Sequence, residues 1–236
     1  MKAVTALIAR TQLTRGRVLT LLAVSGLSLL FAVGIAAGDA GGSKFLDTIS
    51  MIDGFALTVA APVVALVLAS AAFGDLVDDG TLVYLWLRPV PRWQLAAGAA
   101  AASVGTALPI VVIPVTAAAA IGSGFDSTAI VATAAATTVA VIGYAGLFLA
   151  LGLKIRRALI WGLAYILIWE GFVSRGVAGA AKLSIQVHAR TILARLAETE
   201  LPRNPSAELT AFAVPIVVGV VAAALTARWL RTTEVA

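Results

Sequence analysis

The sequence predicts an all-α integral membrane protein with six transmembrane helices. Of its 236 residues, 61% are hydrophobic and only 12% are charged, and the mean hydropathy is +1.01. A soluble domain carries about 25% charged residues, so this chain has too few charges to cover a globular surface. Its charged residues are separated by stretches about one membrane thickness long, and its basic residues favour one side of the resulting spans.

The gaps between charged residues locate the spans. Crossing about 30 Å of hydrocarbon takes about 20 residues of helix, and five charge-free stretches have between 19 and 33 residues. A sixth stretch, between Arg157 and Glu170, has 12 residues, but residues 158–174 are apolar apart from Glu170. We predict a single transmembrane domain over 1–236, with spans at about 18–37, 54–74, 95–121, 128–153, 158–174 and 209–228.

The third predicted span has a charge-free stretch of 33 residues, which is longer than one crossing needs. Pro109 and Pro114 lie inside it, and each removes one backbone hydrogen bond of a helix. The economical interpretation is one kinked or tilted helix. The alternative is a re-entrant break, which requires that the broken segment face protein or a water-filled cavity.

The basic residues give the orientation, because cytoplasmic loops are enriched in lysine and arginine. With the N-terminus inside, eleven basic residues lie on the inner side and six on the outer side. The net charge is then +7 inside and −2 outside. We therefore predict a multi-pass protein of the cell (plasma) membrane with both termini in the cytoplasm.

Residues 2–16 predict an amphipathic helix that lies in the inner headgroup layer, in contact with membrane lipids. One face carries the apolar residues and the opposite face the basic ones. The apolar face consists of Val4, Leu7, Ile8 and Thr11, and the basic face of Lys2, Arg10 and Arg17. Anionic lipids of the inner leaflet attract such a basic face.

Residues 175–208 are too polar to cross the membrane and form a predicted extracellular segment. Within it, Ala189, Ile192, Leu193 and Leu196 share one helical face, which predicts a short helix lying on the outer surface. His188, the only histidine of the chain, is expected to be solvated and is assigned no role.

The predicted spans carry no charged residue near their middle. Ion- or proton-coupled carriers usually need such residues to bind the coupling ion, so the sequence argues against a self-powered secondary transporter. Glu170, near the outer end of the fifth span, has two interpretations. We favour a carboxylate at the outer interface beside Trp169, and the alternative is part of an extracellular gate.

Catalysis by this chain is not predicted. The chain has no cysteine and one histidine, which excludes disulfides, thiolate metal sites and multi-histidine metal centres. It also lacks the Gly-x-x-x-x-Gly-Lys-Ser/Thr phosphate loop of an ATPase. We predict no catalytic residue, no metal site, no cofactor in this subunit and no nucleic-acid partner.

The most informative stretch is the inner loop 75–93, between the second and third spans. Asp79-Gly80 is a turn signal, and Thr81 can cap a short helix. Leu82, Leu85 and Trp86 share one face of that helix, and Pro89 ends it. Because the loop carries three aspartates, which anionic lipid repels, its apolar face is expected to dock on a protein partner. An ordinary interfacial hairpin is the alternative.

This loop resembles that of the ABC-2 type permeases, the membrane subunits of ATP-binding cassette exporters. In that family an acidic residue precedes Gly-Thr-Leu, a leucine-rich short helix follows, and Pro-x-x-Arg leads into the next span. The matching residues are Asp75, Asp78, Asp79, Gly80, Thr81, Leu82, Leu85, Trp86, Leu87, Arg88, Pro89 and Arg92. The six-span layout, the basic N-terminal helix and the outer segment are also similar. Two departures are aspartate in place of the usual glutamate, and the alanine-rich run 96–102 where a lysine is often found.

The resemblance implies a permease half, similar to type V exporters, that works as a dimer with a second copy or a paralogue. A separate cytoplasmic ATPase subunit, carrying ATP and Mg²⁺, would dock on the loop. Leu82, Leu85 and Trp86 would form the docking knob, with Asp78, Asp79 and Arg88 as its charged rim and Gly80 as the tight turn. A rival class is a membrane scaffold that recruits a partner without moving cargo. A membrane-embedded enzyme ranks last, because the sequence has no histidine–carboxylate cluster or paired membrane aspartates.

Overall fold

The computed structural model describes residues 2–38, 43–80, 91–174, 178–201 and 208–232, and these residues form helices and no strand. Two of the helical segments, labelled η1 and η2, have the wider π-helical turn. The elements are α1 (Lys2–Gln12), α2 (Arg15–Ala37), α3 (Lys44–Met51), η1 (Ile52–Ala60), α4 (Ala61–Asp78), α6 (Arg92–Ser123), α7 (Ser127–Lys154), α8 (Ala158–Ala164), η2 (Tyr165–Val173), α10 (Ala178–Ala181), α11 (Ile185–Leu196) and α12 (Glu208–Thr232).

Five helices of the described chain are long and apolar enough to cross a membrane, as predicted for five of the six spans. They are Arg15–Ala37, Lys44–Asp78, Arg92–Ser123, Ser127–Lys154 and Leu209–Arg231. The second runs without a break through α3, η1 and α4, so it begins ten residues before the predicted 54–74. The apolar helix Ala158–Val173 is shorter and reaches about 24 Å at 1.5 Å per residue.

The third long helix, α6, is continuous from Arg92 to Ser123 and contains both Pro109 and Pro114. The re-entrant break considered for this stretch is therefore absent from α6. Proline is tolerated inside apolar helices where neighbouring helices cover the freed backbone groups.

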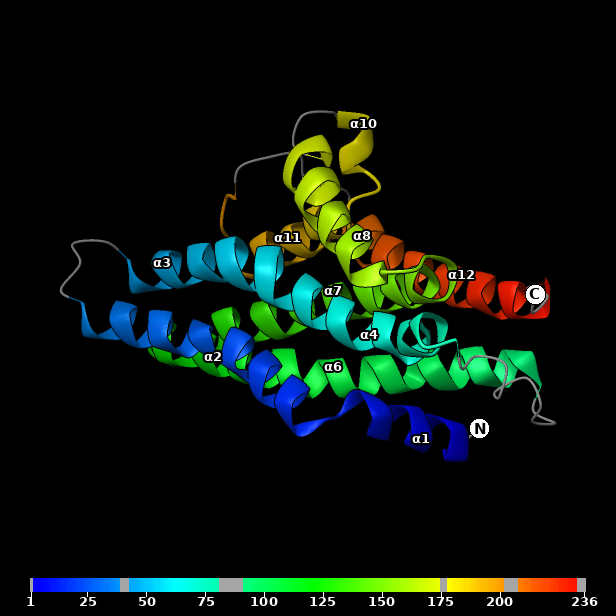
Figure 1. Cartoon of the computed structure of the whole chain (residues 1–236). Coiled ribbons are helices and arrows are strands. Elements are labelled where there is room, and N and C mark those ends of the chain that lie inside the picture. Colours follow the sequence, from blue (N-terminus) through cyan, green and yellow to red (C-terminus); the bar gives the residue numbers. More distant parts are fainter. Residues whose placement is uncertain (1, 39–42, 81–90, 175–177, 202–207, 233–236) are drawn as a thin grey trace.

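The long helices lie side by side, and both chain termini lie at one end of the bundle (Figure 1). We call this the near end and the opposite end the far end. At the centre is α7, which packs against α4, α6, α11 and α12. Small residues allow two of these contacts to be close: a Cβ added at Gly146 would lie 2.4 Å from Cα of Gly219 on α12, and one at Gly152 would lie 2.5 Å from the carbonyl oxygen of Ser70 on α4.

The N-terminal helix α1 lies along α6 rather than across the bundle (Figure 1). Its buried face differs from the expected apolar one, because Ile8 and Gln12 are buried whereas Leu7 is 52% exposed. The Gln12 side-chain amide donates to Ser103 Oγ at 2.9 Å and to the Leu68 carbonyl at 3.0 Å, and accepts from Thr106 at 3.1 Å. Polar contacts with α4 and α6 therefore fix α1, in addition to any contact with lipid.

The helix expected to lie on the outer surface is covered by other helices of the protein. Helix α11 packs against α7, α12 and η1, and seven of its residues are buried. The expectation of a solvated His188 is wrong: its side chain is 2% exposed, and Nδ1 lies 2.7 Å from the carbonyl oxygen of Ser184. The amphipathic pattern predicts the helix α11, but the helices that cover it come from distant parts of the chain.

The apolar helix formed by α8 and η2 leans away from the five long helices (Figure 1). Its contacts with the bundle include those of α8 with α4 and α7. At Gly162 an added Cβ would lie 2.1 Å from Cδ1 of Leu66 on α4, so a larger residue there would require the Leu66 side chain to move. Most of its large apolar side chains are exposed: Leu159, Ile160, Trp161, Leu163, Leu167, Ile168 and Phe172.

Candidate functional site

Two buried carboxylates from the two π-helical segments converge on α11. Asp53 lies in η1 and Glu170 in η2. The side chain of Glu170 is bonded to the start of α11, and that of Asp53 to the middle of α11. A π-helical turn departs from the regular α-helix and occurs frequently at functional sites. We therefore treat α11 and the two carboxylates as one candidate site, the carboxylate cluster.

Glu170 caps the N-terminus of α11. Its Oε1 accepts the backbone N–H of Ile185 at 3.1 Å and the hydroxyl of Tyr165 at 3.2 Å, and Oε2 accepts the hydroxyl of Ser184. The Ser184 Oγ in turn accepts the backbone N–H of Val187 at 3.1 Å. A negative charge at a helix N-terminus is favoured by the unpaired N–H groups of its first turn. This carboxylate therefore stabilises a helix that begins inside the protein.

The start of α11 lies near the middle of the bundle. An added Cβ at Gly143 of α7 would lie 3.2 Å from Cγ2 of Ile185, and Gly143 is 16 residues after Ser127 and 11 before Lys154, the two ends of α7. A row of aromatic rings also joins this part of α7 to η2. Tyr144 stacks on Phe148, which meets Tyr165 edge to face, and Tyr165 stacks on Trp169.

Glu170 is therefore a buried side chain, whereas the favoured interpretation placed it at the outer interface. It is 2% exposed, and its partners come from the interior start of α11. Glu170 still lies near the end of the helix Ala158–Val173, so the absence of charge near the middle of the spans stays a prediction. The alternative interpretation, a gate, remains a prediction.

Asp53 forms the second contact with α11. Its Oδ2 is paired with the guanidinium of Arg190, and both side chains are largely buried. Beside this pair, the Gln186 amide of α11 donates to Thr58 Oγ1, and Thr58 Oγ1 donates to the Asp53 carbonyl at 2.9 Å. Asp53 and Arg190 are 137 positions apart. In the sequence Asp53 directly precedes the predicted span 54–74, and no local pattern indicates either partner.

At the near end, α4 is tied to two other helices by the first aspartates of the predicted docking loop. Asp75 Oδ2 pairs with Arg17 of α2 at 3.2 Å. Asp78 Oδ1 accepts the backbone N–H of Arg157 at 3.3 Å, just before α8. A cavity of about 250 Å³ lies between α2, α4 and α8, and these four residues are part of its lining. Asp78 therefore has a structural partner, in addition to its predicted place on the docking rim.

The other predicted loop residues divide into two groups. Asp79 is exposed at the end of α4, Gly80 follows it with φ of +67°, as the tight turn requires, and Arg92 begins α6. Left-handed backbone of this kind favours glycine. The remaining residues, Thr81, Leu82, Leu85, Trp86, Arg88 and Pro89, lie outside the described residues.

Within the described ranges, no group of three or more His, Asp or Glu side chains could hold a metal ion. The described residues include polar contacts between helices at the near end, around Gln12 and at α11. Comparison with protein-family models and with curated proteins finds no match to this chain.

Proposed function

We propose that this chain is one permease half of an ABC-2 type, ATP-driven exporter, working as a dimer with a separate cytoplasmic ATPase subunit. The observation that carries the proposal is how two helices connect the near end to α11. The helix Lys44–Asp78 bears Asp75 and Asp78 at one end and Asp53 toward the other. The helix Ala158–Val173 starts at the bond to Asp78 and ends close to Glu170.

This arrangement gives a physical route from the docking loop to the interior. A partner that pulls on loop 75–93 acts directly on Asp75 and Asp78, and so on the starts of α2 and α8. The helices Lys44–Asp78 and Ala158–Val173 are both bonded to α11, through Asp53 and Glu170, and the first turn of α11 lies in the middle of the bundle. Packed helices have few intermediate arrangements, so small shifts at one end become discrete changes at the other.

The interior start of α11 supports transport over a purely structural role. Transporters often bind cargo or coupling ions near the bilayer midplane, where a helix begins or ends inside the protein. Here the N-terminus of α11 faces the carboxylate of Glu170. In the proposal this cluster holds the far half of the path closed and opens when α8 and η2 move, which gives Glu170 the role of a gate.

We also propose how the shorter helices and the termini are placed relative to the membrane. Ala158–Val173 serves as a sixth span, α1 sits at the inner membrane boundary with its basic residues toward lipid headgroups, and both termini are cytoplasmic in a plasma membrane. The exposed apolar face of α8 and η2 is then covered by lipid and by the second permease copy. ATP and Mg²⁺ would be bound by the partner subunit, which is the only part of the complex expected to catalyse hydrolysis.

The test uses Leu85→Asp together with Trp86→Asp in the full-length chain, purified from its native membranes. We expect the wild-type chain to co-purify with a subunit that hydrolyses ATP, and the double variant to lose at least 90% of that ATP hydrolysis. The reason is that two buried charges in an apolar docking face lack partners.

The matched control is Leu183→Asp together with Phe125→Asp, which adds the same two charges at exposed residues away from the near end. This control is expected to keep the ATPase subunit. Equal ATP hydrolysis by the loop variant and the control, per mole of permease, contradicts the docking proposal.

The scaffold alternative is separated by a measurement that needs no known cargo. Because the chain has no cysteine, spin labels can be placed singly at Phe125→Cys and Leu209→Cys, where both native side chains are exposed. In a complex with two labelled permease copies, a permease changes the distance between the label on one copy and the label on the other when ATP and vanadate are added. A scaffold binds the ATPase subunit and shows the same distance in both conditions.

A further inference from the structure

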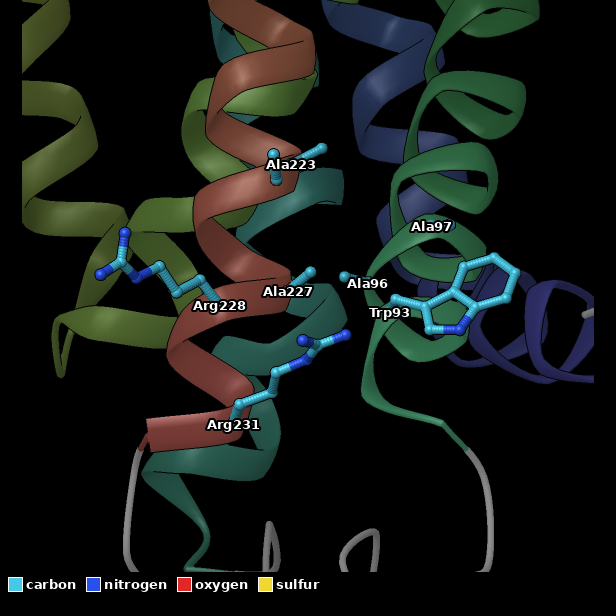
Figure 2. Close-up of a pocket in the computed structure, with 8 residues that line it drawn as sticks. Trp93, Ala96, Ala97, Ala223, Ala227, Arg228 and Arg231 are labelled. Atoms are coloured by element: carbon cyan, nitrogen blue, oxygen red, sulfur yellow. The ribbon is translucent and has the colours of Figure 1, made fainter.

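A cavity of about 600 Å³ opens at the near end between the first turns of α6 and the last turns of α12 (Figure 2). Its wall consists of five alanines from the two helices, and its rim carries Trp93, Arg228 and Arg231. No aspartate or glutamate is among the described residues that line it. The volume lies within the range of about 300–1,000 Å³ typical of small-molecule sites.

The rim side chains are placed unequally. Figure 2 shows the guanidinium of Arg231 directed towards α6 and Trp93, whereas the side chain of Arg228 extends to the other side of α12. Trp93 is 49% exposed. The cavity therefore combines one directed cation and one exposed aromatic ring with an apolar wall.

We propose that this cavity binds one anionic phospholipid. Arg231 pairs with the phosphate, since a guanidinium matches phosphate oxygens with two parallel hydrogen bonds. The alanine wall accepts the glycerol and the upper part of an acyl chain, because alanine side chains are apolar and small enough to leave space for these lipid groups. Trp93 lies at headgroup level, where tryptophan is enriched in membrane proteins.

The site is consistent with its place in the chain. Both α6 and α12 are candidate spans, and Trp93 and Arg231 stand at their near-end termini. Basic pockets between transmembrane helices are a recurrent way of binding anionic headgroups. A soluble organic phosphate would pair with Arg231 but leave the alanine wall exposed to water, which is why a lipid is the occupant. The inference needs only that the five long helices cross a membrane, and not the ATPase partner.

The test measures lipid binding to the purified full-length chain in a neutral detergent by native mass spectrometry. The probes are dioleoyl phosphatidylglycerol, dioleoyl phosphatidylcholine and the soluble headgroup glycerophosphoglycerol. We expect phosphatidylglycerol to bind at least fivefold more tightly than phosphatidylcholine, and Arg231→Gln to weaken it about fivefold, corresponding to about 1 kcal/mol for one basic residue. The control Arg156→Gln removes the same charge from an exposed residue that does not line the cavity, and it should leave the affinity unchanged.

A second measurement locates the lipid. Brominated phosphatidylglycerol should quench more tryptophan fluorescence in the wild-type chain than in Trp93→Phe, while both bind the lipid. Equal affinity for the two lipids, equal weakening by Arg231→Gln and Arg156→Gln, glycerophosphoglycerol binding as tightly as the lipid, or unchanged quenching in Trp93→Phe would each overturn the proposal.

Discussion

Glu170 satisfies three donors with one side chain: the hydroxyls of Tyr165 and Ser184 and the backbone N–H of Ile185. Two of these donors belong to Ser184 and Ile185, which are fully buried. The carboxylate therefore has two functions, which are to begin α11 and to hold it against η2. Its removal leaves buried donors without a partner, and each such donor costs about 1–3 kcal/mol.

We predict that Glu170→Ala lowers the melting temperature in detergent by roughly 5–10 °C, because at least one of these donors loses its partner without access to water. Glu170→Gln should lower it by less than half as much. A glutamine oxygen can still accept from Tyr165 and Ile185, and the Ser184 hydroxyl can rotate to accept from the amide. Thermal unfolding followed by intrinsic fluorescence measures both values.

Glu200→Ala is the control, because Glu200 is exposed, and it should leave the melting temperature within about 1 °C of the wild type. If Glu170→Ala behaved like Glu200→Ala, the carboxylate would not be what holds α11 in place.

At the scale of whole helices, close contact between small residues holds the bundle together. Within a membrane, water does not drive helices together, so association depends on packing and on close approach of backbones. The contact of Gly146 with Gly219 joins α7 to α12, and the contact of Gly152 with Ser70 joins α7 to α4. These contacts place the central helix beside both the near-end aspartates of α4 and the buried face of α11.

Gly146→Ala is predicted to destabilise the protein, because its Cβ would lie 2.4 Å from a backbone atom of Gly219 that cannot turn away. Overpacking of this kind costs about 1–3 kcal/mol, which corresponds to a fall in melting temperature of roughly 3–10 °C. Gly105→Ala on α6 is the matched control, since nothing lies within 4 Å of its added Cβ. The control should be neutral or slightly stabilising, as alanine is preferred to glycine inside a helix. Equal melting temperatures for the two variants would contradict close α7–α12 packing.

For the whole molecule, the spans could be predicted from the sequence because a long charge-free stretch is a property of neighbouring residues. The five long helices contain the corresponding predicted segments, and α6 continues through Pro109 and Pro114. The environment of α11 could not be predicted in the same way. Its partners Asp53 and Thr58 lie more than 120 positions away, and an amphipathic helix has the same pattern whether lipid, water or protein covers its apolar face.

At the near end, the sequence likewise does not predict which residues are in contact. The loop pattern predicts a functional role for Asp75, Asp78 and Gly80, and the structure shows that the two aspartates bond to Arg17 and to the backbone of Arg157. Those partners follow from the arrangement of α2, α4 and α8 in space. The proposal therefore depends on the orientation of the near end, which sequence indicates only through the excess of basic residues.

The orientation can be measured directly because a chain without cysteine reports only on the cysteine introduced. Arg10→Cys and Arg156→Cys mark the near end, and Ser127→Cys and Glu200→Cys mark positions away from it; all four native residues are exposed. With a membrane-impermeant maleimide on intact cells, we expect Ser127→Cys and Glu200→Cys to react, and the other two to react only after permeabilisation. Labelling in denaturant controls for the expression of all four variants. The reverse pattern would place loop 75–93 outside the cell, away from ATP, and the proposed coupling to an ATPase subunit would then be physically impossible.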